Sequence, residues 1–67
     1  MKLRARWGAG YFDVPLVIVM DDPVLEIEFS DSDGYTEEDR QGIAALKPGE
    51  VWWENSPHPS HSIGRLA

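Results

Sequence analysis

The sequence predicts an α+β fold in which a mainly antiparallel sheet of three to four strands carries one short helix on one face. Residues 2–7 and 24–30 alternate between polar and apolar side chains, which is typical of half-buried strands. A helix-capping pattern at Thr36 then precedes a helical stretch of about ten residues. The predicted order along the chain is therefore strand, strand, strand, helix, strand.

The first two strands are predicted on either side of a glycine turn. Residues 2–7 form the first strand, residues 8–10 turn the chain, and residues 11–20 form the second strand. Pro15 indicates an edge or a bulge near the start of the second strand. Residues 16–20 are apolar on both faces, so we expect this part to be central in the sheet and covered on both sides.

The third strand, at residues 24–30, has the clearest alternation in the chain. It follows a turn formed by Asp21, Asp22 and Pro23, residue types that favour turns. Its predicted inward side chains are Leu25, Ile27 and Phe29, and its outward ones are Glu26, Glu28 and Ser30.

The helix is predicted to begin after Thr36. The hydroxyl of this residue can accept a hydrogen bond from the amide three residues later, and the acidic residues 37–39 lie at the positive end of the helix dipole. Pro48 and Gly49 cannot continue the helix. The residues predicted to face the sheet are Ile43, Ala44 and Leu46.

A short last strand is predicted at residues 50–54. Because Trp52 and Trp53 are adjacent, they point to opposite faces of a strand. Parity with the preceding valine buries Trp53 and leaves Trp52 exposed among acidic residues, unless the C-terminal tail covers it. We expect residues 1–55 to form a single small α+β domain, and residues 56–67, with two prolines and three serines, to form an irregular tail.

The composition limits where the protein works. The 67 residues include no cysteine, which excludes disulfides, thiolate zinc sites and cysteine nucleophiles, so a reducing cytoplasm is the expected location. The longest apolar run, residues 14–20, contains a proline and is too short to span a bilayer. The N-terminal residues lack the pattern of a secretory signal, and we expect no association with a membrane.

The charges are segregated along the chain, whose formal net charge is -6. Residues 21–39 contain nine acidic residues and no Lys or Arg. Direct binding to nucleic acid is not expected, because clustered cations supply that affinity. A surface this negative instead predicts a basic partner. The nine acidic residues are Asp21, Asp22, Glu26, Glu28, Asp31, Asp33, Glu37, Glu38 and Asp39.

The sequence contains no recognisable metal site. An EF-hand register that begins at Asp31 places Thr36 where glycine is required and Gly42 where the bidentate glutamate belongs. His58 and His61 are too few for a zinc site and lie in the predicted tail. We therefore expect no metal and no cofactor.

Catalytic arrangements are equally weak. Glu26 and Glu28 share one face of the predicted third strand, but no pattern around them indicates the burial that a raised pKa requires. Ser56 and His61 could be combined with an acidic residue, but no nucleophile elbow surrounds the serine. The chain is predicted not to be an enzyme.

Part of the acidic stretch has a structural explanation. Arg4 and Arg6 could neutralise Glu26 and Glu28 if the first and third strands pair. Residues 37–39 are explained by the start of the helix. The acidic residues in the turns at either end of the third strand have no such explanation, and these are Asp21, Asp22, Asp31 and Asp33.

In size, acidity, lack of cysteine and compact α+β order, the chain resembles the small acidic inhibitor proteins of phages and mobile elements, including anti-CRISPR proteins and other DNA mimics. The acidic stretch at residues 21–39 carries this resemblance. The resemblance implies a mechanism in which carboxylates spaced like phosphates occupy the Lys and Arg groove of a nucleic-acid-binding complex and keep the nucleic acid out.

We predict a non-enzymatic binding module that inhibits a basic nucleic-acid-binding protein or complex. The alternative is a small structural or accessory protein that forms a homodimer through the apolar second strand, residues 11–20, and Trp52. The predicted partner-binding residues are Asp21, Asp22, Glu26, Glu28, Asp31, Asp33, Glu37, Glu38, Asp39 and Trp52.

Overall fold

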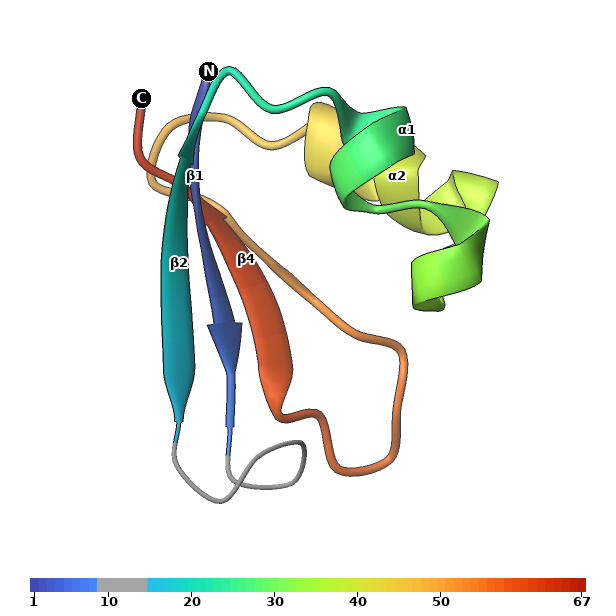
Figure 1. Cartoon of the computed structure of the whole chain (residues 1–67). Helices are drawn as coiled ribbons and strands as arrows, with labels where there is room; N and C mark the ends of the chain where they lie inside the picture. Colours follow the sequence, from blue (N-terminus) through green and yellow to red (C-terminus); the bar gives the residue numbers. More distant parts are fainter. Residues whose placement is uncertain (9–14) are drawn as a thin grey trace.

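The computed structural model describes residues 1–8 and 15–67, which form a four-stranded antiparallel sheet with short helices over one face (Figure 1). The α+β class predicted from the sequence is confirmed. The strand order in the sheet is β2-β1-β4-β3. In chain order the elements are β1 (Lys2–Trp7), β2 (Leu16–Asp21), α1 (Leu25–Glu28), η1 (Asp31–Asp33), α2 (Glu37–Ala44), β3 (Val51–Trp53) and β4 (His61–Arg65).

Strand β1 lies at the centre of the sheet and has the predicted alternation. Leu3 and Ala5 are fully buried beneath the helical layer, while Arg4 and Arg6 lie on the opposite face. Its neighbours β2 and β4 both run antiparallel to it. The opposite face of the sheet is called the open face below.

Strand β4 corrects the prediction that residues 56–67 form an irregular tail. Residues 61–65 make the second central strand, and residues 61–64 are all buried. Backbone hydrogen bonds extend the pairing with β1 at both ends, from Lys2 N to Ala67 O at 2.9 Å and from Gly8 N to Ser60 O at 2.6 Å. Serine, glycine and histidine are weak strand formers, so the strand depends on pairing and burial that local propensity does not reveal.

Strand β2 was expected to be central but lies at the edge of the sheet. Both edges of β1 are occupied, by β2 and β4, and β2 itself has no second neighbour among the described strands. Residues 16–19 are consequently 39–52% exposed despite being apolar on both faces. The part of the predicted strand at residues 11–14, and most of the predicted glycine turn, lie outside the described residues.

The prediction of a strand at residues 24–30 is wrong. The segment forms the short helix α1, and Leu25 and Phe29 face the core from positions one helical turn apart. Ile27, which a strand would have buried, is 68% exposed. Leu25 and Phe29, four residues apart, share a face in a strand and also in a helix. Ile27 shares that face only in a strand, so its position distinguishes the two structures.

Helix α2 begins as predicted. Thr36 Oγ1 accepts a hydrogen bond from Asp39 N at 3.1 Å, and Asp39 Oδ2 accepts one from Thr36 N at 2.9 Å, which completes a capping box. Gly42 lets the helix approach β3 closely, since a Cβ at this position would lie 3.2 Å from Cδ1 of Trp52.

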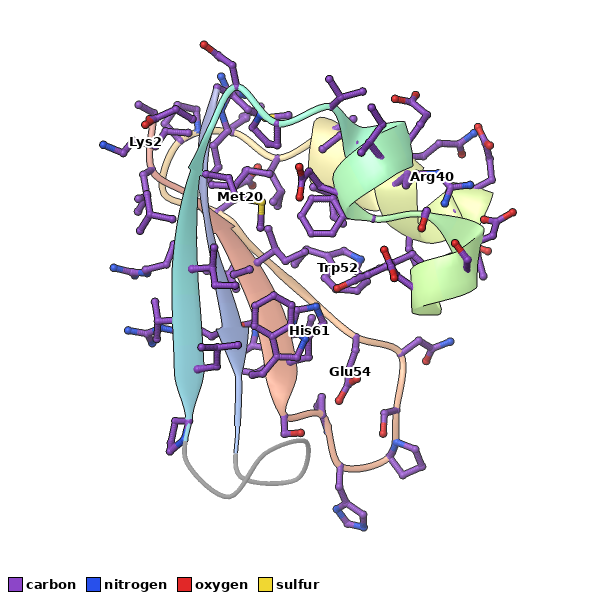
Figure 2. The ribbon with its side chains drawn as sticks, in the orientation of Figure 1. Lys2, Met20, Arg40, Trp52, Glu54 and His61 are labelled. Carbon is purple, nitrogen blue, oxygen red and sulfur yellow. The ribbon has the colours of Figure 1, made fainter. Side chains whose placement is uncertain are left out.

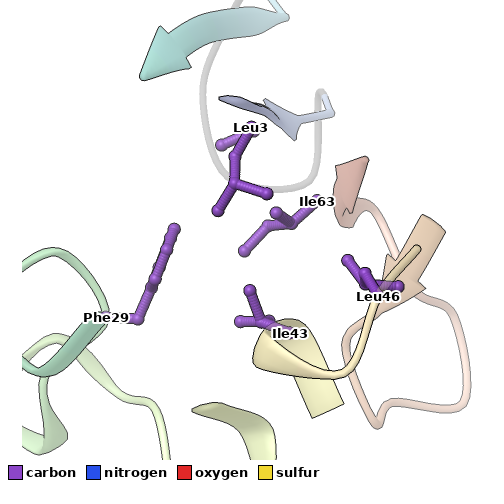
Figure 3. Close-up of a cluster of buried hydrophobic side chains, with 6 residues drawn as sticks. Leu3, Phe29, Ile43, Leu46 and Ile63 are labelled. Atoms are coloured by element: carbon purple, nitrogen blue, oxygen red, sulfur yellow. The ribbon is translucent and has the colours of Figure 1, made fainter. Parts of the chain in front are cut away.

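The core lies between the helical layer and the covered face of the sheet (Figure 3). Ile43 and Leu46 point inward as predicted, whereas Ala44 is exposed. Figure 1 shows the helical layer beside the end of the sheet where β1 begins, away from the end where β4 begins. The buried apolar residues are Leu3, Ala5, Phe29, Ile43, Leu46 and Ile63.

Candidate functional site

The helical layer gathers seven of the nine acidic residues of the predicted site. All seven are contributed by α1, η1 and α2, which follow one another along the chain with short connections. Six of them are exposed and Asp39 is half-buried. We call this surface the acidic layer, and its members are Glu26, Glu28, Asp31, Asp33, Glu37, Glu38 and Asp39.

Arg40 is the one cation within the segment that carries the acidic layer, and it is engaged there. Its Nη2 lies 2.8 Å from Asp31 Oδ1 and 3.6 Å from Glu37 Oε2, and its Nη1 donates to the carbonyl oxygen of Phe29 at 2.8 Å. The hydrogen bond to Asp31 raises the pKa of Arg40 above its ordinary value. Arg40 thus ties the three short helical elements together and partly neutralises Asp31 and Glu37.

Asp21 and Asp22 lie apart from the acidic layer, at the end of β2. Asp21 Oδ1 is 3.8 Å from Lys2 Nζ, and the amino group of Met1 donates a hydrogen bond to Asp22. That hydrogen bond lowers the pKa of Asp22. Asp21 and Asp22 each pair with a nearby cation, which the sequence did not reveal. Asp31 likewise pairs with Arg40.

The proposed neutralisation of Glu26 and Glu28 by Arg4 and Arg6 is wrong. The two arginines project from the open face of the sheet, whereas the two glutamates lie on a helix that covers the other face. Among the described residues, neither glutamate has an ion-pair partner. The molecule therefore carries opposite charges on its two sides.

His61, which was predicted to lie in the irregular C-terminal tail, is buried. Its ring stacks on Trp7, its partner across the β1–β4 pairing, with ring centroids 4.5 Å apart and an angle of 14° between the planes. Nδ1 lies 2.7 Å from the carbonyl oxygen of Arg6, and Nε2 lies 2.6 Å from Tyr35 Oη. Because a carbonyl oxygen only accepts, Nδ1 donates to it, and in the neutral ring Nε2 accepts from the tyrosine.

The two adjacent tryptophans have the opposite orientation from the one predicted. Trp52 pairs with Ile63 of β4 and shares its face, so it is half-buried against the core. Its ring centroid lies 5.9 Å from that of His61 and 6.2 Å from that of Tyr35. Trp53 is 57% exposed. The prediction was wrong because it assumed that Val51 faces the core, whereas Val51 lies on the open face.

These aromatic rings lie in a groove of about 970 Å³ that runs between the start of α2 and the β3–β4 end of the sheet. Figure 2 shows Trp52, His61 and Glu54 on the side of the sheet that faces the helices. Glu54 Oε1 accepts a hydrogen bond from Ser60 N at 2.8 Å, which holds this carboxylate at the end of β3. Below we call this space the aromatic groove. Its described ring-bearing and acidic lining residues are Trp7, Tyr35, Trp52, Trp53, His61, Asp33, Glu38, Asp39 and Glu54.

The open face has a second, smaller cavity of about 580 Å³ with a different character. Arg4 and Arg6 lie at its centre, with Val17 on one side and Val51 and Trp53 on the other. This surface is apolar and cationic, and none of the nine acidic residues of the predicted site lines it.

Within residues 1–8 and 15–67, no three His, Asp or Glu side chains come close enough together to hold a metal ion. None of the helices there has the length and apolar character required to cross a bilayer.

These features define a small α+β domain that combines a highly acidic helical layer with an aromatic groove beside it. Comparison with protein-family models, with curated proteins and with solved structures returned no match to this chain. Its function must be inferred from its own residues.

Proposed function

We propose that this chain is a non-enzymatic binding module whose acidic layer occupies a basic surface of a nucleic-acid-binding protein or complex. Through that contact it inhibits the partner, because nucleic acid and the acidic layer compete for the same Lys and Arg side chains. We further propose that it meets this partner in the cytoplasm.

The observation that carries the proposal is the imbalance of charge in the acidic layer. Seven carboxylates lie on three consecutive short elements, and the single cation among them, Arg40, is already paired with Asp31 and Glu37. Glu26 and Glu28 are exposed and have no ion-pair partner among the described residues. Like charges held this close repel one another, and a basic partner would relieve that repulsion.

The test uses the chain as an immobilised bait in a bacterial lysate. A captured protein should be basic, should be lost as salt rises from about 50 mM to about 500 mM, and should be displaced by duplex DNA or structured RNA. Displacement is the decisive step, since it shows that the bait and the nucleic acid share one surface. Capture that nucleic acid leaves unchanged would overturn the proposed inhibition.

A matched pair of variants separates the acidic layer from net charge. Glu26→Gln with Glu28→Gln removes two negative charges from the acidic layer, and Leu66→Lys with Ala67→Lys changes the net charge equally beyond β4. We expect the first variant to bind about fivefold to tenfold more weakly, since each exposed ion pair contributes up to about 1 kcal/mol, and the second to bind nearly as the parent does. Equal losses would contradict a specific role for the acidic layer.

A second candidate function is homodimerisation through β2. This edge strand is apolar on both faces and 39–52% exposed over residues 16–19, and its outer backbone edge, which pairs with none of the described strands, can pair with a second copy. The part of this hypothesis that used Trp52 as a contact is not supported, because Trp52 lies on β3, at the opposite edge of the sheet from β2.

Light scattering at several protein concentrations tests the dimer. A dimer should be converted to a monomer by Val17→Lys with Val19→Lys, which places two charges on the open face of β2. Thr36→Ser, a conservative change remote from β2, serves as the control and should leave the mass unchanged. A parent chain that is a monomer at every concentration would rule this function out.

A further inference from the structure

We propose that the aromatic groove binds an arginine side chain of a basic protein partner, with the guanidinium group placed against the rings and paired with the surrounding carboxylates. The inference rests on the proposed function, because it names the anchoring contact within the same interaction. Three features of the groove support it: its rings, its charge and its size.

The rings supply surfaces on which a planar cation can stack. Trp7 and His61 are stacked on each other across β1 and β4, and Trp52 meets His61 edge to face, with an angle of 77° between their planes. Both tryptophans are half-buried, so each keeps part of its surface accessible to the groove. Indole rings attract cations more strongly than other aromatic side chains do.

The charge of the groove excludes anions and favours cations. Four carboxylates line it and no Lys or Arg is among its described lining residues. Asp33 and Asp39 each accept a hydrogen bond within the protein, from Ser30 Oγ at 3.0 Å and from Thr36 N at 2.9 Å, and these bonds fix their positions. Glu38 has no hydrogen-bond or ion-pair partner among the described residues and is exposed at the rim.

Arginine fits a groove of aromatic rings and carboxylates better than lysine does. A guanidinium group is flat, so it can stack on an indole while its N–H groups still reach carboxylates in the plane of the group. An ammonium group is more strongly hydrated and acts as a point charge. The groove volume of about 970 Å³ is also large enough to accept an arginine together with the adjoining peptide backbone.

The test compares three blocked five-residue peptides, in which glycines alternate with two arginines, two lysines or two citrullines. Citrulline has the shape of arginine without its charge. Each peptide is titrated into the intact chain, and the indole N–H resonances of the three tryptophans are followed by two-dimensional NMR. We expect the arginine peptide to shift the Trp7 and Trp52 indole signals at concentrations where the citrulline peptide has no effect.

The Glu38→Gln variant tests the rim, with Glu26→Gln as its control. Both replacements remove one exposed carboxylate of the acidic layer, but only Glu38 lines the groove. We expect Glu38→Gln to weaken binding of the arginine peptide about threefold to tenfold and Glu26→Gln to change it by less than about twofold. Unchanged backbone spectra in the absence of peptide confirm that both variants fold.

Several outcomes would overturn the groove proposal. Equal binding of the arginine and lysine peptides would contradict the proposed recognition of a guanidinium group. Equal effects of the two variants, or shifts confined to α1, would show that the cation meets the acidic layer and leaves the groove empty. In those cases the proposed function could still hold, because its own test depends on displacement by nucleic acid and on Glu26 and Glu28. If nucleic acid did not displace the captured protein while the arginine peptide still bound, the groove would bind arginine but the proposed inhibition would be wrong.

Discussion

His61 illustrates at the residue scale how a polar side chain can organise a small core. Both ring nitrogens have hydrogen-bond partners, the carbonyl oxygen of Arg6 on β1 and the hydroxyl of Tyr35 ahead of α2, while the ring stacks on Trp7. A buried polar group that has its hydrogen bonds costs little and fixes one arrangement of its neighbours. The same contacts that stabilise the sheet thereby form the floor of the aromatic groove.

Asp22 gives a prediction about pH at the same scale. The hydrogen bond from the Met1 amino group lowers the folded-state pKa of Asp22 below its value in the unfolded chain. A carboxyl group with a lowered folded-state pKa contributes stability above its unfolded pKa, about 3.9, and this contribution disappears as pH falls through the folded-state pKa. Asp22→Asn should therefore lower the urea midpoint near neutral pH and have no effect in strong acid.

The measurement is a series of urea unfolding curves between about pH 6 and about pH 2. Asparagine is the appropriate replacement because Asp22 has a φ of 46°, a conformation that asparagine tolerates. Asp21→Asn is the control, because it replaces the neighbouring carboxylate, which lies 3.8 Å from Lys2 Nζ and does not pair with the Met1 amino group. A difference between the parent and Asp22→Asn that does not shrink with acid would contradict the role given to this ion pair.

At the scale of elements, the sequence predicted those whose signals are local. The first strand and the start of α2 depend on alternation and on a capping box, which lie within a few residues. Residues 24–30 were predicted as a strand because positions 25 and 29 share a face in a strand and also in a helix. The packing of the segment against the core favours the helix. Strand β4 was missed because its residues form a strand only when β1 pairs with them.

The same distinction applies to the candidate site. The acidic layer could be predicted because its seven carboxylates are close together in the sequence, whichever elements they occupy. The aromatic groove could not, because it joins Trp7 of β1, His61 of β4 and the loop residue Tyr35, and these meet only after the sheet has formed. Residues 61–65 contain a single large apolar residue, Ile63, and follow two prolines, so no local pattern marked the strand that carries His61.

At the scale of the whole molecule, the fold separates charge by side. The acidic layer covers one face of the sheet, while Arg4 and Arg6 lie on the open face among apolar residues such as Val17, Val51 and Trp53. A sheet only one layer thick keeps these groups apart, so the cations of β1 do not neutralise the acidic layer. The segregation leaves the side of the molecule that carries the acidic layer strongly negative.

This separation predicts an unusual response to salt. Repulsion within the acidic layer outweighs its one ion-pair network, so screening it should stabilise the fold. Raising sodium chloride from about 10 mM to about 500 mM, which shortens the screening length from about 30 Å to a few ångströms, should raise the thermal midpoint measured by circular dichroism. In Glu26→Gln with Glu28→Gln the midpoint should start higher at low salt and rise less. A midpoint that falls with salt would show that ion pairs such as Arg40 with Asp31 dominate instead, and the acidic layer would then have no stored repulsion for a partner to relieve.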